Sequence, residues 1–222
     1  MWKPQASRIR KAVESLCRKG YAVVDEALGQ ESVAELRAEI RSLKDRNVMY
    51  KNATHIVHKD GRTEYLEKKN IYEWDSAHPD WSSCTEAIPK LDALHNDFSL
   101  CEAINEALPT QHLISQTLKI QHNQGEGGCF PVHFDTDAGL DSRSVTAILY
   151  LNEDWKASDG GQLALYPFPF EKVEVEPVAD RLVLFSSANM PHRVMPSSTD
   201  RYCLTLWLSK LEEATPGGGG TN

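Results

Sequence analysis

The chain has 222 residues, 41% of them hydrophobic and 25% charged, a composition typical of a globular protein with one sizeable core. Its net charge of −8 disfavours a protein that follows a nucleic-acid backbone, which needs clustered lysine and arginine. No apolar run approaches the length of a membrane span, and residues 1–20 lack the apolar segment of a secretory signal. The five cysteines include no close-spaced pair, which argues against a disulfide framework. We therefore expect a cytoplasmic or nuclear protein without nucleic-acid or membrane partners.

The first half of the chain alternates helical and extended patterns. Apolar residues recur at helical spacing in segments 6–19, 30–43 and 88–108, the last with an interruption near Ser99. Short strands are predicted at 21–24 and 70–74, and Asp60-Gly61 indicates a hairpin turn between them.

After Pro109 the pattern changes to short strands separated by turns. The predicted strands are 112–121, 129–135, 145–151, 162–166, 173–176, 181–186, 192–195 and 201–208. This rhythm predicts a mainly β protein with some α structure, a double-stranded β-helix (a cupin-like jelly roll). The N-terminal helices would pack on its larger sheet. We expect one domain over 1–213, with helical support and a lid region in 1–109 and the jelly-roll core in 110–213, followed by a flexible tail at 214–222.

Three residues have the types and spacing of a metal site. His133 and Asp135 are two apart on an extended segment, so their side chains point the same way, and His192 begins a later strand. Two imidazoles and one carboxylate can occupy one face of an octahedral iron(II) and leave adjacent positions open. We therefore predict that His133, Asp135 and His192 are the metal ligands and the catalytic centre.

The dipeptide spacing alone is not specific, because histidine-x-aspartate occurs four times in this chain. The other three begin at His58, beside a turn, at His78, before a proline, and at His95, within a helical pattern. Solvated polar residues explain these three. Only the pair at His133 is followed by alternating strands, a second histidine and an arginine on the next strand.

Arg201 is the candidate anion-binding residue. It opens a mostly apolar strand, where a buried guanidinium needs an anion such as a dicarboxylate co-substrate. Thr205 lies four residues on, on the same strand face, and Tyr150 ends a neighbouring strand, so both can add hydroxyl donors. Two alternatives remain open: Arg201 forms an ordinary salt bridge with Asp200 or Asp180, and Trp207, which shares its parity, is a core residue.

These residues resemble the prolyl 4-hydroxylase branch of the iron(II)/2-oxoglutarate-dependent oxygenases, most of all the intracellular hypoxia-sensing prolyl hydroxylases. The similarity spans about residues 118–208. The motifs that carry it are His133-Phe-Asp135, Arg143-Ser-Val-Thr146, Tyr150-Leu-Asn152, Asp154-Trp155, Gly160-Gly161-Gln-Leu163, Glu176-Pro177, Asp180-Arg-Leu-Val-Leu-Phe185, Pro191-His192 and Arg201-Tyr202-x-x-Thr205-x-Trp207.

The resemblance implies a dioxygenase that hydroxylates a prolyl residue of a protein or peptide and decarboxylates 2-oxoglutarate to succinate and CO2. Iron(II), 2-oxoglutarate and O2 are the implied cofactors, with ascorbate as a further one. Arg201, Tyr150 and Thr205 would hold 2-oxoglutarate. Arg143 corresponds to an arginine near the peptide site of that family, and Trp207, which shares the strand face of Arg201 and Thr205, would line the pocket.

The resemblance also implies a mobile lid over about residues 70–81. We expect Trp74 and Trp81 of this segment to clamp the peptide, with packing of the two rings as the alternative. One departure concerns the segment before the iron pair, where the family usually has a tyrosine. Here the segment reads His122-Asn123-Gln124-Gly125, so His122 or Asn123 would replace the phenol.

Three alternatives to prolyl hydroxylation remain open, the first of them because of this departure. The same oxygenase chemistry on another residue or on a small molecule is one of them. A zinc hydrolase is another, because the same three ligands also bind zinc, and a non-catalytic cupin-like binding module is the last. The anion site at Arg201 disfavours the hydrolase, and the complete ligand set disfavours the binding module.

Overall fold

Two antiparallel sheets face each other and enclose the pocket. The computed structural model describes residues 6–136 and 141–211. Its major sheet has the strand order β1-β9-β6-β11-β4-β3-β2, and its minor sheet has the order β5-β10-β7-β8. The strands are β1 (Tyr21–Val24), β2 (Tyr50–Val57), β3 (Thr63–Asp75), β4 (Leu113–Asn123), β5 (Gly128–His133), β6 (Arg143–Tyr150), β7 (Leu163–Leu165), β8 (Val173–Val175), β9 (Leu182–Ser186), β10 (His192–Ser197) and β11 (Arg201–Lys210). The predicted jelly roll is confirmed, and β4 to β11 match its eight predicted strands.

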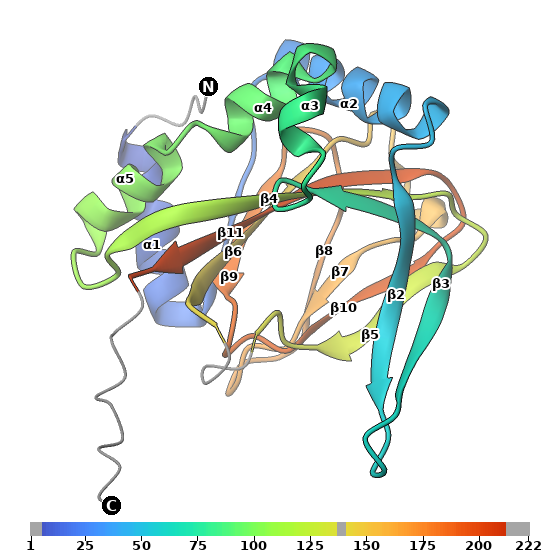
Figure 1. Ribbon diagram of the computed structural model, residues 1–222. Helices are drawn as coiled ribbons and strands as arrows, with labels where there is room; N and C mark the ends of the chain where they lie inside the picture. Colours follow the sequence, from blue (N-terminus) through green and yellow to red (C-terminus); the bar gives the residue numbers. More distant parts are fainter. Residues whose placement is uncertain (1–5, 137–140, 212–222) are drawn as a thin grey trace, which may run out of the picture.

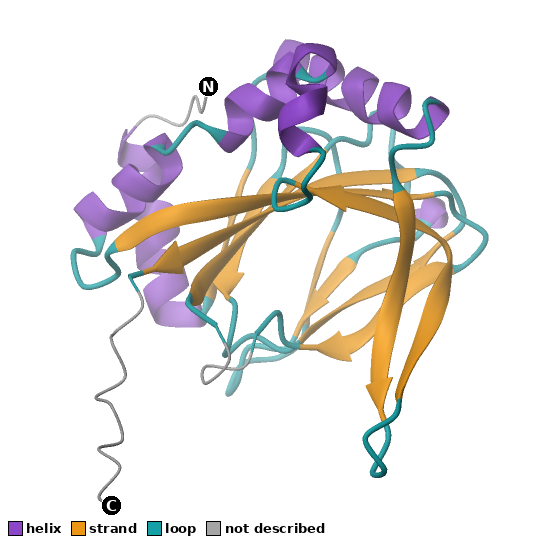
Figure 2. Ribbon diagram, in the orientation of Figure 1, coloured by secondary structure: helices purple, strands orange, loops and turns teal. Residues whose placement is uncertain are grey.

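The helices lie on the outer face of the major sheet, as predicted (Figures 1 and 2). They are α1 (Ala6–Lys19), α2 (Gln30–Asp45), α3 (Trp81–Cys84), α4 (Pro89–His95) and α5 (Ser99–Ala107), with short 3-10 turns η1 (Thr85–Ala87) and η2 (Ala157–Asp159). The predicted interruption near Ser99 separates α4 from α5, because the Asp97 carboxylate accepts the backbone N–H of Ser99 at 3.0 Å. Within the described residues, no helix combines the length and apolarity that crossing a membrane requires.

Strand β11 shows how the major sheet divides two environments. Tyr202, Leu204, Leu206 and Leu208 pack into the main core, which also contains the buried faces of the helices. The residues between them, Arg201, Cys203, Thr205 and Trp207, line a pocket that faces the minor sheet. The twofold period of the strand thus separates a structural face from a polar face.

A long hairpin of β2 and β3 projects from the body of the protein (Figure 1). The predicted turn at Asp60-Gly61 lies at its tip, where Gly61 has a φ of 83°. The strands on either side were not predicted in full, since most side chains from Thr63 to Lys69 are exposed on both faces and show no alternation. The N-terminal half therefore supplies three strands of the major sheet besides helices.

The division into support (1–109) and catalytic core (110–213) stays a prediction, as does the single-domain assignment. The tail predicted at 214–222 lies outside the described residues.

Candidate active site

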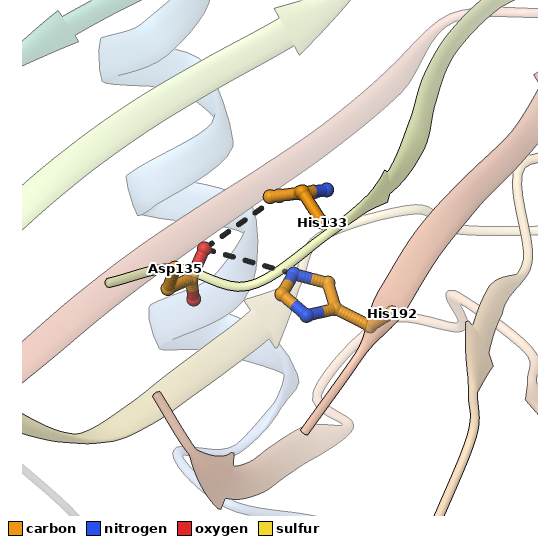
Figure 3. A group of neighbouring side chains, drawn as sticks. All are labelled: His133, Asp135 and His192. Atoms are coloured by element: carbon orange, nitrogen blue, oxygen red, sulfur yellow. Dashed lines mark ion pairs between the residues drawn. The ribbon is translucent and has the colours of Figure 1, made fainter. Parts of the chain in front are cut away.

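His133, Asp135 and His192 come together where β5 and β10 pair (Figure 3). His133 ends β5, His192 begins β10, and the two residues are direct partners in the antiparallel ladder. Their Nε2 atoms lie 3.7 and 3.6 Å from Asp135 Oδ1, and one potential ligand atom from each residue lies within 4.8 Å of the others. No other group of three such residues meets this criterion in the described part of the chain. The geometry suits the predicted site, although the role of the three residues as ligands stays a prediction.

Backbone carbonyls fix the orientation of both histidine rings. His133 Nδ1 lies 2.9 Å from the carbonyl oxygen of Pro131, and His192 Nδ1 lies 3.0 Å from that of Met190. A carbonyl oxygen only accepts, so both Nδ1 atoms carry the proton and each Nε2 keeps a free lone pair. Burial lowers the pKa of His192 against the opposing charge of Asp135, which favours the neutral ring that a metal requires.

Two hydroxyl side chains hold Asp135. Thr146 donates a hydrogen bond of 2.6 Å to Asp135 Oδ2 and lies 2.9 Å from the Ser187 hydroxyl. The backbone N–H of Asp135 donates to the carbonyl oxygen of Ser187 at 3.1 Å. Oδ1 is therefore left facing the two histidines. Sequence reasoning missed both supports, although Thr146 shares the strand face of Tyr150 on β6.

The three residues open into a pocket with about 450 Å³ of empty space. The wall combines charged, polar and apolar side chains. Its lining residues are Lys119, Gln121, Phe130, His133, Asp135, Ile148, Leu163, His192, Val194, Arg201, Cys203, Thr205 and Trp207. The predicted residues Arg201, Thr205 and Trp207 thus share one pocket with the histidines, whereas Lys119, Gln121 and Cys203 were not predicted.

Arg201 is a buried cation without a carboxylate partner in residues 6–136 and 141–211. Its side chain donates to the carbonyl oxygen of Gly161 at 2.8 Å and to Cys203 Sγ at 3.3 Å. The residue is 2% exposed. A guanidinium this deep needs an anion to offset its lost hydration.

The predicted alternative partners of Arg201 are engaged elsewhere. Asp200 lies 2.9 Å from His122. Asp180 accepts the backbone N–H groups of Leu28 and Gly29 at 2.7 and 2.8 Å and so holds the start of α2. The ordinary salt bridge of Arg201 is therefore wrong for both carboxylates.

Tyr150 lies beside Arg201, with its ring 5.1 Å from the guanidinium carbon. The residue is fully buried, and its hydroxyl has no hydrogen-bond partner among the described residues. Burial raises the pKa of Tyr150, so the hydroxyl keeps its proton and can donate it. A carboxylate at Arg201 would satisfy this otherwise costly donor. Thr205 lines the same pocket two residues beyond Cys203.

Arg143 and Trp207 stack beside the three metal-site residues. The Arg143 guanidinium lies 4.1 Å from the Trp207 ring and donates to the carbonyl oxygen of Asp135 at 3.2 Å. Both positions are compatible with the predicted substrate role, which stays a prediction. The Trp207 side chain lines the pocket and is not part of the main core.

Two substitutes for the missing phenol were predicted wrongly. His122 points to the helical side of the sheet, where its ring stacks on Tyr202 at 4.2 Å. Asn123 holds the turn that follows β4: its amide donates to the carbonyl of Gly128 at 2.8 Å and accepts from the N–H of Gly125 at 3.0 Å. Neither side chain lines the pocket. Gln121, one residue before His122, lines it instead.

The lid at residues 70–81 stays a prediction, but the predicted clamp by its two tryptophans is wrong. Trp74 and Trp81 stack at 4.9 Å within the main core, and neither is available to a peptide. The segment leads from β3 into the helical layer, and none of its residues lines the pocket. The bulk of the two rings signals a packing role as readily as a binding role, so sequence alone could not separate them.

The chain matches the family model described as "2OG-Fe(II) oxygenase superfamily" over residues 118–209. It is 30% identical over 213 residues to a Caenorhabditis elegans protein named hypoxia-inducible factor prolyl hydroxylase, covering 90% of this chain. The chain spans only 28% of that relative.

Two solved structures are similar over nearly the whole chain. A prolyl 4-hydroxylase structure from Phytophthora capsici has 34% identity and a TM-score of 0.79, covering 97% of this chain and 70% of that one. A prolyl hydroxylase from Trichoplax adhaerens, solved with a peptide fragment of the hypoxia-inducible factor oxygen degradation domain, has 25% identity and a TM-score of 0.75. The alignment covers 92% of this chain and 90% of the Trichoplax chain.

Proposed function

The chain belongs to the 2OG-Fe(II) oxygenase superfamily, and from that premise we propose that it hydroxylates a prolyl residue of a protein. The reaction would consume O2 and 2-oxoglutarate and release succinate and CO2, with ascorbate as an accessory reductant. One observation carries the proposal: two histidines and one aspartate share a pocket with a buried arginine that has no carboxylate partner in the described part of the chain.

The donor set fits iron(II) with 2-oxoglutarate. Two imidazole nitrogens and one carboxylate oxygen suit a non-haem iron with open positions. When bound, the metal and co-substrate supply the oxidising power for inserting oxygen into a C–H bond. The same ligands also suit zinc, but a hydrolase gives no reason for the buried anion site at Arg201 and Tyr150.

The residues of the chain itself would bind, orient and exclude water. Arg201, with the Tyr150 hydroxyl and the Thr205 hydroxyl, would bind the distal carboxylate of 2-oxoglutarate. Thr146 and Ser187 would keep Asp135 in place beside the histidines. The apolar wall of Ile148, Leu163 and Val194 would limit the access of water.

The proposed target is a proline in a polypeptide. The names of the relatives in worm, Phytophthora and Trichoplax support the proline, and the Trichoplax complex supports a peptide. A proline's fixed φ reduces the entropy lost when an extended segment binds. All five cysteines are free thiols, which favours a reducing location in the cytoplasm or nucleus.

Mass spectrometry tests this proposal directly. The purified protein is incubated with iron(II), 2-oxoglutarate, air and a peptide digest of a cell lysate, and peptides that gain one oxygen atom are sequenced. We expect the oxygen on proline, with succinate formed in step and no reaction without 2-oxoglutarate. Oxygen on another residue would point to a different hydroxylase, and hydrolysis without succinate would contradict the oxygenase.

A further inference from the structure

Two lysines stand on the side of the pocket that faces the β2–β3 hairpin. Lys119 of β4 lines the pocket and forms an ion pair with Glu73 of β3. Lys68, also on β3, places its Nζ 3.8 Å from the ring centre of Phe130, which lines the same pocket. The two ammonium groups therefore approach the pocket from adjacent strands, one inside it and one above its aromatic wall.

Among the described residues, Lys119 has a carboxylate partner and Lys68 has none. Glu73 is paired with Lys119 and also accepts a hydrogen bond from the Asn52 amide. Lys68 has no ion pair among residues 6–136 and 141–211. Two carboxylates of the hairpin have other partners, Glu64 with His58 and Glu67 with Lys51, and Glu126 of the β4–β5 turn is paired with Lys69.

The surroundings of Lys68 make its charge costly. The pKa of Lys68 is lowered to about 8, mainly by burial and then by the charge of Lys119, with Glu73 and Cys129 opposing. A half-buried cation at a pocket wall gains when an anion arrives, because the new ion pair offsets its lost hydration. The adjacent Lys69 is exposed and paired with Glu126 at 3.5 Å, so it offers a natural control.

The 2-oxoglutarate co-substrate would have partners for both of its ends without the Lys68 ammonium. Its distal carboxylate would have Arg201 and Tyr150, and its other end would have the metal. Lys68 precedes the last β3–β4 pair, Ile71 with Asn123, and so lies where β3 leaves the major sheet and approaches β5. There the Lys68 ammonium lies over Phe130 at the pocket wall, where a side chain of a bound polypeptide would reach it.

We propose that Lys68, with Lys119 behind it, binds an aspartate or glutamate side chain of the polypeptide substrate close to the target proline. The inference rests on the proposed function and adds a substrate class to it: an acidic sequence beside the hydroxylated residue. Cation and carboxylate would form a charge-assisted hydrogen bond over the face of Phe130.

A peptide scan tests the charge preference. Short synthetic peptides with one central proline carry aspartate, asparagine or lysine at each flanking position in turn, and the initial rate of oxygen gain is measured. We expect aspartate to exceed asparagine at one position by about tenfold in kcat/KM, the size of one charged hydrogen bond. Lys68→Met should abolish this preference without changing the KM for 2-oxoglutarate, and Lys68→Arg should keep it.

Matched variants separate the ion pair from general effects. Lys69→Met should retain the full preference, and Lys68→Glu should transfer it to the lysine peptide. In the wild type the preference should decline as the pH rises through about 8, since Lys68 loses its proton, and it should persist in Lys68→Arg. Cys129→Ser controls for the nearby thiol.

The outcomes distinguish the two proposals. Equal rates for aspartate and asparagine at every position would overturn the acidic specificity while leaving prolyl hydroxylation intact. A Lys68→Met variant that raises the 2-oxoglutarate KM would assign the cation to the co-substrate and would also overturn it. If no proline peptide gains oxygen, both the prolyl hydroxylation and the acidic specificity are contradicted.

Discussion

The two faces of β11 differ in what they contribute. On the helical face, Tyr202, Leu204, Leu206 and Leu208 are buried among apolar side chains. On the pocket face, Arg201, Cys203, Thr205 and Trp207 combine a buried charge with hydroxyl, thiol and indole groups. Neighbouring residues of one strand therefore have separate roles: the helical face holds the sheet against the helices, and the pocket face is available for chemistry. Variants on each face should affect different measurements.

The largest effect is expected at the metal site itself. His133→Ala, Asp135→Ala and His192→Ala should each abolish turnover and weaken metal binding, because each removes one of three ligand atoms. Thermal unfolding should stay close to wild type, since the three residues lie at strand ends. Metal binding is measured by calorimetry and turnover by succinate formation. His58→Ala and His95→Ala are the controls with near wild-type activity, and full activity in a metal-site variant would refute the assignment.

Arg201→Ala should cause the next largest loss. Its removal leaves the distal carboxylate of 2-oxoglutarate desolvated and unpaired, at a cost on the order of 3–5 kcal/mol by analogy with buried ion pairs. The 2-oxoglutarate concentration needed for half-maximal succinate formation should rise accordingly. If the 2-oxoglutarate concentration needed is unchanged, Arg201 does not bind the distal carboxylate.

Leu204→Ala tests the opposite face. The side chain is fully buried in the main core, so the free energy of unfolding should fall by about 2–5 kcal/mol. Chemical denaturation measures the loss, and the 2-oxoglutarate requirement of the remaining folded protein should be unchanged. A large change in the 2-oxoglutarate requirement with little loss of stability would contradict the separate roles of the two faces.

Single hydroxyl deletions in the pocket should have smaller effects. Tyr150→Phe and Thr205→Val each remove one donor from the carboxylate, worth roughly 1–3 kcal/mol in 2-oxoglutarate affinity. Their combination should be non-additive if both hydroxyls bind one carboxylate. Titration of 2-oxoglutarate against the single and double variants measures this coupling.

The smallest effect concerns pH and His122 on the helical face. Burial lowers the pKa of His122 from its ordinary 6.5, although Asp200 opposes the shift. The unfolded chain therefore binds a proton at a pH where folded His122 does not, so the folded state loses stability as the pH falls below 6.5. His122→Gln should make stability less dependent on pH in this range. Denaturation midpoints at neutral and mildly acidic pH provide the measurement, and an unchanged dependence would contradict the prediction.

The sequence by itself determined the elements of the jelly roll and the residues that meet at its mouth. Strand and helix patterns follow from local periodicity, which a buried face imposes on each segment. His133, Asp135, His192 and Arg201 stood out because their residue types are rare in apolar strands without a polar partner.

Only the tertiary structure decided which face each side chain occupies where both faces are buried. Residues 120–123 of β4 are all buried, so alternation is absent there, and a shift of one residue exchanges His122 for Gln121 at the pocket. Trp74 and Trp81 were equally ambiguous, because a large ring suits a core and a binding site alike. The position of Lys68 and Lys119 beside the pocket depends on contacts among β3, β4 and β5, which local sequence patterns do not reveal. Local patterns record how buried a residue is but not which neighbours bury it.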